Sequence, residues 1–207
     1  MSQVTLFDAV DHDEPGTGRY ADGLSRRELT RGAWLDVRPG WVLRPDLLME
    51  RLLADTPWRG ERRQMYDRVV DTPRLLSFHG AGDPWPHPLL HAMRAELSAH
   101  YRPELGEDFV TAGLCLYRDG RDSVAWHGDR IGRGSTHDTM VAIVSLGEVR
   151  RLALRPRGGG RSLQIPMASG DVVVMGGTAQ RTWEHAVPKM RNAGPRISVQ
   201  FRVAGVR

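Results

Sequence analysis

The stretch Arg196-Ile197-Ser198-Val199-Gln200-Phe201-Arg202 alternates strictly between polar and apolar side chains. Successive side chains of a β-strand leave opposite faces, so the two arginines share one face with Ser198 and Gln200, and the three apolar residues share the other. A face that carries two arginines either is solvated or lines a polar cavity, and periodicity alone allows both.

Similar short runs precede this strand and are separated by clusters of Gly, Asp and Arg. They cover residues 109–118, 139–146, 150–154 and 171–175. This spacing is typical of a β-sandwich or barrel. The N-terminal half predicts a strand over 33–42 and helices over 45–53 and 88–101, each helix with a proline near its start. The fold class is therefore mainly β (α+β), with helices segregated to the N-terminal half.

Composition indicates one globular domain. The chain has 207 residues, of which 40% are hydrophobic and 26% charged, and this excludes a disordered chain. Residues 1–24 hold five acids against one arginine, so we expect an acidic, partly disordered segment there and a single domain over 25–207. Neither a membrane-spanning apolar run nor a signal-peptide pattern is visible, and we expect a cytoplasmic monomer without membrane contact.

The basic residues are almost all arginines. Of 29 Lys and Arg residues, only Lys189 is a lysine. Genomic base composition and a polyanionic partner explain this equally well, although arginine suits bidentate phosphate contacts. The single Cys115 excludes an internal disulfide and a thiolate zinc cage. Any metal must therefore be held by histidine and carboxylate.

A candidate metal site lies in Trp126-His127-Gly128-Asp129. On an extended strand the His127 and Asp129 side chains leave the same face, with only a glycine between them. His185, behind another predicted strand, supplies a third ligand. Two histidines and one carboxylate form the facial triad that leaves positions open on Fe(II). Each residue alone is a weak signal, because isolated histidines are more often surface or core residues.

Taken jointly and in order, these motifs resemble the AlkB family of Fe(II)/2-oxoglutarate-dependent dioxygenases, which repairs alkylated nucleic acid bases. The resemblance also rests on the segments Tyr117-Arg118-Asp119-Gly120, Gly170–Met175, His185–Lys189, Pro73-Arg74 and Trp85-Pro86. It covers about residues 30–204 and implies a double-stranded β-helix, or jelly roll. Fe(II), the co-substrate 2-oxoglutarate and O2 are the implied cofactors.

The resemblance also implies roles for individual residues. His127, Asp129 and His185 would bind iron, and Arg196 would pair with the distal carboxylate of 2-oxoglutarate. Arg202 would line the same pocket, and Tyr117 would contact the co-substrate. The chain departs from the family at Cys115 and Ser198, where asparagine is usual, and at Ile131, where an acidic residue is frequent. A weaker hydrogen bond to 2-oxoglutarate follows as a hypothesis, since a thiol is a poor donor and acceptor.

The implied reaction is oxidative demethylation of N-alkylated bases in DNA, of the 1-methyladenine and 3-methylcytosine type, with release of formaldehyde. Alternatives are an RNA or tRNA demethylase, a hydroxylase of the same fold, or a noncatalytic metal- or nucleic-acid-binding jelly roll. A flipped base needs an aromatic clamp and a cationic rim. The candidates are Trp58, Tyr66 and Arg74 in a substrate lid over about 58–80, and Arg161. A solvated loop with one packed aromatic residue explains the lid segment equally well.

Overall fold

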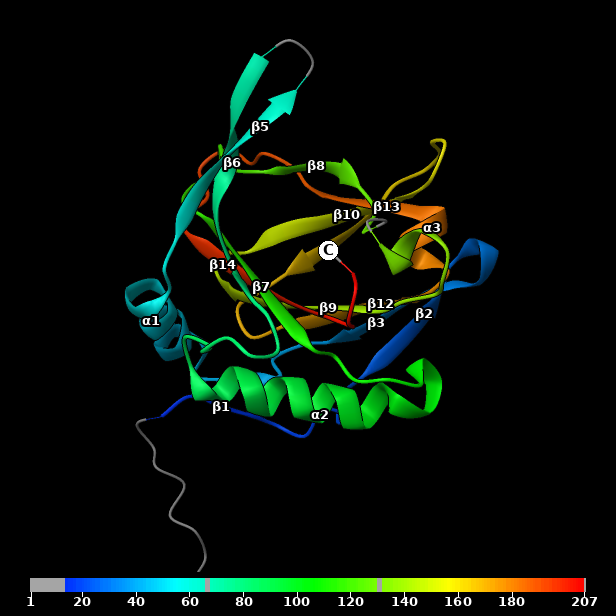
Figure 1. Cartoon of the computed structure of the whole chain (residues 1–207), viewed down its shortest axis with the longest axis horizontal. Coiled ribbons are helices and arrows are strands. Elements are labelled where there is room, and N and C mark those ends of the chain that lie inside the picture. Colours follow the sequence, from blue (N-terminus) through cyan, green and yellow to red (C-terminus); the bar gives the residue numbers. More distant parts are fainter. Residues whose placement is uncertain (1–13, 66–67, 130–131, 207) are drawn as a thin grey trace, which may run out of the picture.

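Two β-sheets face each other in the computed structural model, which describes residues 14–65, 68–129 and 132–206 (Figure 1). The large sheet has the strand order β2-β3-β12-β9-β14-β7-β6-β5 and the small sheet the order β11-β10-β13-β8. The large-sheet strands are β2 (Ser25–Glu28), β3 (Ala33–Arg38), β5 (Arg59–Met65), β6 (Arg68–His79), β7 (Thr111–Tyr117), β9 (Val141–Gly147), β12 (Val172–Gly177) and β14 (Arg196–Arg202). The small-sheet strands are β8 (Val124–His127), β10 (Arg150–Pro156), β11 (Leu163–Met167) and β13 (Trp183–Val187). The predicted mainly β architecture with helices in the N-terminal half is confirmed.

Two long helices, α1 (Pro45–Asp55) and α2 (Pro88–Leu105), pack against the large sheet, and α2 lies beneath it in Figure 1. Helix α2 begins at a proline, with the side chain of His87 accepting a hydrogen bond from the Leu89 N–H, and it stops at Gly106 in the left-handed region. Its buried stripe of Leu90, Met93 and Leu97 follows the 3.6-residue period. The short elements are η1 (Thr30–Gly32), η2 (Arg133–Ser135) and α3 (Ala179–Thr182).

The two faces of β14 belong to different environments. Ile197, Val199 and Phe201 join the core between the helices and the large sheet. The opposite face points into the space between the sheets, where Cys115 and other inner residues form a second core. Because Arg196 is buried there, the polar face of β14 lines a cavity, which decides between the two alternatives that the alternation left open.

The N-terminal segment joins the body earlier than residue 25. Strand β1 (Gly16–Thr17) pairs with β4 (Val42–Leu43), and the buried Tyr20 hydroxyl lies 2.7 Å from that of Tyr101. The Trp41 indole N–H donates to the Gly18 carbonyl oxygen. Partial disorder was expected over 1–24; residues 1–13 lie outside the described part, and residues 14–24 pack on the domain.

The expected lid segment forms a β-hairpin of β5 and β6 that extends away from the two facing sheets (Figure 1). Only the base of β6 pairs with β7, over Leu75 to His79. The predicted strand over 33–42 is divided into β3 and β4, because Pro39 and Gly40 turn the chain and Gly40 adopts φ 57°.

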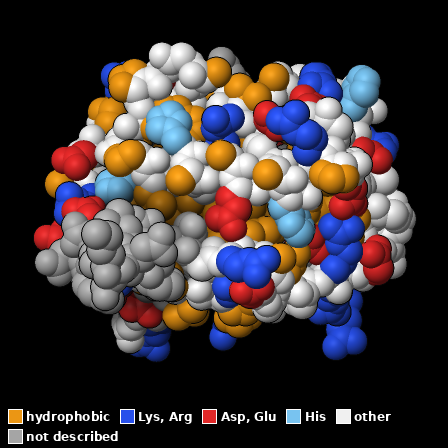
Figure 2. Space-filling model, turned by 90° about the horizontal axis from the view of Figure 1, so that it is seen from below, with side chains coloured by type: hydrophobic (Ala, Val, Ile, Leu, Met, Phe, Trp, Pro, Cys, Tyr) orange, Lys and Arg blue, Asp and Glu red, His pale blue; other side chains and the backbone are white. Residues whose placement is uncertain are grey.

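The face seen from below α2 mixes acidic and basic side chains (Figure 2). None of the helices within the described residues is long and apolar enough to cross a membrane.

Candidate active site

The three predicted metal ligands meet at one end of the space between the sheets. His127 and His185 are directly paired across β8 and β13, which places both imidazoles on the inner face with ring centroids 4.2 Å apart. Asp129 follows just after β8, and its carboxylate lies 3.7 Å from His127 Nε2. Ligand atoms of the three residues all lie within 4.8 Å of one another. This donor set matches the facial triad preferred by Fe(II).

The protonation of the triad suits metal binding. His127 Nδ1 lies 2.9 Å from the Ala125 carbonyl oxygen, and because that oxygen can only accept, Nδ1 carries the proton and Nε2 keeps its lone pair. Burial, together with the neighbouring His127, lowers the pKa of His185 to about 3, so this imidazole is neutral. Burial alone would raise the pKa of Asp129, but Arg202 and the two histidines lower it to about 2. All three side chains are therefore ready to ligate.

Asp129 is fixed through its side chain and its backbone. Arg202 Nε donates to the carboxylate at 2.7 Å, and the Asp129 N–H donates to the Gln180 side-chain oxygen at 3.2 Å. The adjacent Gly128 leaves room for this contact, since a Cβ there would lie 2.7 Å from the Gln180 carbonyl oxygen. Gln180 was not singled out from the sequence; it lies 51 residues from Asp129 and carries no motif.

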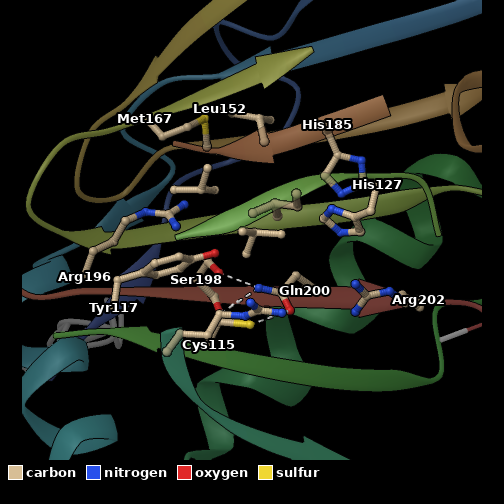
Figure 3. Close-up of a pocket in the computed structure, with 14 residues that line it drawn as sticks. Cys115, Tyr117, His127, Leu152, Met167, His185, Arg196, Ser198, Gln200 and Arg202 are labelled. Carbon is tan, nitrogen blue, oxygen red and sulfur yellow. Dashed lines mark hydrogen bonds between the residues drawn. The ribbon is translucent and has the colours of Figure 1, made fainter. Parts of the chain in front are cut away.

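A cavity of about 520 Å³, measured to its open mouth, extends from the histidines along β14 and β7 (Figure 3). Its polar side includes Cys115, Tyr117, Ser198 and Gln200. Across from them, Leu152 and Met167 of the small sheet supply apolar side chains. The cavity therefore has a polar wall to orient a ligand and an apolar wall to exclude water.

Arg196 lies at the far end of this cavity, and no carboxylate of the described residues forms an ion pair with it. Its Nε donates to Ser145 Oγ at 2.9 Å, but its buried Nη1 has no hydrogen-bond partner among the described residues. Burial lowers the pKa of Arg196 from its ordinary value, yet a guanidinium remains charged. The Tyr117 ring lies 5.2 Å from the guanidinium. A buried cation with a free donor fits a carboxylate that enters with the ligand.

Comparison with known proteins agrees with this geometry. The family model of the 2OG-Fe(II) oxygenase superfamily matches residues 46–202. The chain belongs to this superfamily. It is 29% identical to alpha-ketoglutarate-dependent dioxygenase alkB homolog 3 of Homo sapiens over 89% of this chain and 70% of that protein. It is 31% identical to uncharacterized protein R406 of Acanthamoeba polyphaga mimivirus over 59% of this chain and 63% of that protein.

Among solved structures, that of OsALKBH1 matches with a TM-score of 0.52 and 16% identity, and covers 86% of this chain and 99% of that one. This likeness confirms the jelly-roll fold. The chain is thus an AlkB-family 2-oxoglutarate-dependent dioxygenase whose cofactors are Fe(II), 2-oxoglutarate and O2, and the cavity holds a donor set that fits each of the first two.

The departures from the family pattern lie side by side in this dioxygenase. Cys115 and Ser198 are directly paired across β7 and β14. The Cys115 thiol contacts Gln200 Oε1 at 3.6 Å, and Gln200 Nε2 donates to the Ser198 hydroxyl and, at 3.0 Å, to the Ser198 carbonyl oxygen. Gln200 belongs to the alternating strand but was not selected as a site residue from the sequence. Ile131 lies outside the described residues.

A second buried arginine supports the cavity from behind. Arg150 donates to the carbonyl oxygens of Asp119, Asp122 and Pro188 at 3.1, 2.8 and 2.9 Å, and its guanidinium lies 5.4 Å from the Tyr117 ring. Arg150 therefore ties the loop after β7 to the end of β13.

The Tyr117 hydroxyl can act as a donor in the cavity. Burial, together with Cys115, raises the pKa of Tyr117 to about 12, so its hydroxyl stays protonated and can donate.

The three predicted substrate residues that the structure describes do not gather at one place. Arg74 lines the cavity beside Tyr117 and donates to the Ser123 carbonyl oxygen at 3.3 Å. Trp58 is half-buried and packs against the core below the large sheet. Arg161 is exposed in the loop between β10 and β11. Tyr66 lies outside the described residues.

Proposed function

We propose that this dioxygenase reverses N-alkyl damage in DNA by demethylating bases of the 1-methyladenine and 3-methylcytosine type. The observation that carries the proposal is the shared cavity: a His-Asp-His triad at one end and a buried, anion-free Arg196 at the other. His127, Asp129 and His185 would hold the iron, and Arg196 would bind the distal carboxylate of the co-substrate. Iron with 2-oxoglutarate and O2 supplies the oxidant that hydroxylates an N-methyl group, which then leaves as formaldehyde.

The protein's own contribution is positioning and exclusion of water. Arg202 orients the Asp129 carboxylate, the Gln180 side chain holds the Asp129 backbone N–H, and the Ala125 carbonyl oxygen holds the His127 ring. The apolar wall of Leu152 and Met167 keeps water from the reacting centre. The β5–β6 hairpin would act as the substrate lid. Its sequence contains four arginines among residues 59–68, which suits a phosphate backbone.

RNA is the alternative substrate, because the same iron site could demethylate the same bases in RNA. The arginine-rich composition suits the phosphates of DNA and RNA equally. The distinction depends on contacts to the 2′-hydroxyl, which the substrate end of the cavity would have to supply.

The test is mass spectrometry of a single-stranded DNA oligonucleotide that bears one 1-methyladenine or 3-methylcytosine. It is incubated with the enzyme, Fe(II), ascorbate and 2-oxoglutarate, beside an RNA of the same sequence and an Asp129→Ala control. We expect the DNA to lose one methylene mass in the wild-type reaction only. If the DNA were unchanged and the RNA demethylated, RNA would be the substrate in place of DNA. If both nucleic acids were unchanged while succinate still formed, the result would contradict both substrates.

A further inference from the structure

The inner wall of the cavity carries a carboxamide side chain, Gln200, that the proposed function leaves without a role. Gln200 lies on β14 between Ser198, toward the Arg196 end, and Arg202, which contacts the metal ligand Asp129. It lines the cavity and is 8% exposed (Figure 3). A carboxamide is thus built into the part of the wall next to the metal ligands.

The strand opposite makes room for this amide. Gln200 is directly paired with Gly113 of β7. A Cβ at residue 113 would lie 3.2 Å from both Gln200 Oε1 and Arg202 Nη1, a distance that would crowd both side chains. The glycine therefore allows the Gln200 and Arg202 side chains to lie across β7.

The present partners of the amide hold it weakly. Within the described part of the chain, its NH₂ group donates to Ser198, two residues away on the same strand, and its oxygen accepts from the Cys115 thiol at 3.6 Å. A thiol is a weak donor, and a neutral hydrogen bond is about half as strong as one to a carboxylate. A carboxylate that enters the cavity would therefore compete favourably for one of the two amide hydrogens.

We propose that Gln200 binds the 2-oxo acid end of the co-substrate, with its amide N–H donating to that carboxylate. This rests on the proposed placement of the distal carboxylate at Arg196. Because Cys115 is a poor hydrogen-bonding group on the facing strand β7, the amide on β14 supplies the neutral N–H donor that Cys115 does not. Gln200 is thus a specificity residue for 2-oxo acids, and Arg196 for the second carboxylate.

Calorimetric titrations of protein loaded with redox-inert Mn(II) test this without turnover or nucleic acid. The ligands are 2-oxoglutarate and 2-oxopentanoate, which has a methyl group in place of the distal carboxylate. We expect Gln200→Leu to weaken both ligands about tenfold or more, since a hydrogen bond to a charged group is lost. Gln200→Glu should weaken both further through charge repulsion, while the matched Arg196→Met weakens only 2-oxoglutarate.

A second substitution separates a lost donor from lost packing. Cys115→Asn places an amide on the neighbouring strand, so adding it to Gln200→Leu should restore most of the affinity for both ligands. Mn(II) affinity and melting temperature should remain near wild-type values in Gln200→Leu.

Three outcomes would overturn the proposal. If Gln200→Leu bound both ligands within twofold of the wild-type affinity, Gln200 would contribute packing only. If Gln200→Leu lost affinity for 2-oxoglutarate alone, Gln200 would act on the distal carboxylate and not on the 2-oxo acid end. Absence of rescue by Cys115→Asn would remove the donor role. If the Mn(II)-loaded wild-type protein bound neither ligand, the co-substrate placement itself would fail, and this result is distinct from any failure on methylated DNA.

Discussion

The two ends of the cavity differ in how their buried charges are balanced. At the metal end, the Asp129 carboxylate is paired with Arg202 at 2.7 Å. At the distal end, Arg196 is equally buried, but its partners among the described residues are neutral groups, the Ser145 hydroxyl and Tyr117. The chain alone therefore completes the electrostatics of the metal end and leaves those of the distal end incomplete.

This difference teaches where ligand binding can contribute stability. An unpaired buried charge costs free energy that a partner restores, so a dicarboxylate at Arg196 should stabilise the fold as well as be held by it. At the triad, Arg202 already pairs with one oxygen of the Asp129 carboxylate, and the other oxygen faces His127, so a metal ion there would meet a charge that is already balanced in part. A ligand at the distal end would therefore be favoured because it neutralises the charge of Arg196, and a metal ion at the triad because the donor atoms are already in position.

The largest expected effect concerns the metal end. We expect His185→Ala to weaken Fe(II) binding more than about a hundredfold, because loss of a ligand exceeds the roughly 10–100-fold cost of outer contacts. The measurement is the visible absorption band that forms when anaerobic Fe(II) and 2-oxoglutarate are added. The exposed His137 provides the matched control, and His137→Ala should keep the band. A band that persists in His185→Ala would contradict the ligand assignment.

The same substitution at both arginines tests the comparison directly. Arg202→Met leaves Asp129 buried and unpaired, and should lower the free energy of unfolding by about 3 kcal/mol. Arg196→Met removes a charge that has no anionic partner, so the protein without ligand should be unchanged or more stable. Urea unfolding without metal or 2-oxoglutarate measures both. If both variants lost the same free energy of unfolding, the charges at the two ends of the cavity would be equally well paired in the protein without ligand.

The sequence predicts which residues of the cavity share a strand face, but not the contacts that depend on distant segments. Spacing and alternation place His127 with Asp129, and Arg196 with Arg202, on one face of a strand each, because a strand fixes which side chains share a face. The role of Arg196 toward 2-oxoglutarate was implied by the resemblance to the AlkB family. Gln180 could not be predicted in its role, since its contact with Asp129 depends on the placement of α3 beside a distant turn. Whether the polar face of β14 meets water or a cavity depends likewise on the second sheet, which no local pattern places.

The N-terminal region shows the same limit. Composition correctly marks residues 1–24 as acidic, but the packing of Tyr20 against Tyr101 joins residues 81 positions apart. The hairpin of β5 and β6 was expected only as a segment, because its charged residues lack the alternation of a half-buried strand. Local signals therefore marked these two segments without showing how they pack.

A smaller effect concerns the loop that joins the two ends, from Tyr117 to β8. Burial would raise the pKa of Asp122, but hydrogen bonds from Arg118 hold it below its usual value. A carboxyl with a lowered folded pKa stabilises above its unfolded value, near about 4, and this contribution is lost as the pH falls through the folded value.

Asp122→Asn should therefore lower the free energy of unfolding by about 1–3 kcal/mol at pH 7, and the difference from wild type should shrink below about pH 4. Urea titrations at several pH values measure this. The more exposed Asp119→Asn should show a smaller change. A difference that stays constant at acidic pH would mean that the Asp122 charge is not involved.

The smallest effect tests the boundary between the ends at Gly113. A Cβ there would lie 3.2 Å from the movable tips of Gln200 and Arg202, so Gly113→Ala should shift both slightly. We expect about threefold weaker binding of 2-oxoglutarate to Mn(II)-loaded protein, equivalent to about 0.6 kcal/mol. Gly60→Ala, also on a strand, would bring its Cβ no nearer than 3.9 Å to Leu75 Cδ2, an ordinary contact, and should leave the affinity unchanged. Unchanged affinity in Gly113→Ala would mean that the two side chains relax freely, and the wall next to the metal would then be less rigid than the paired charges of Asp129 and Arg202 imply.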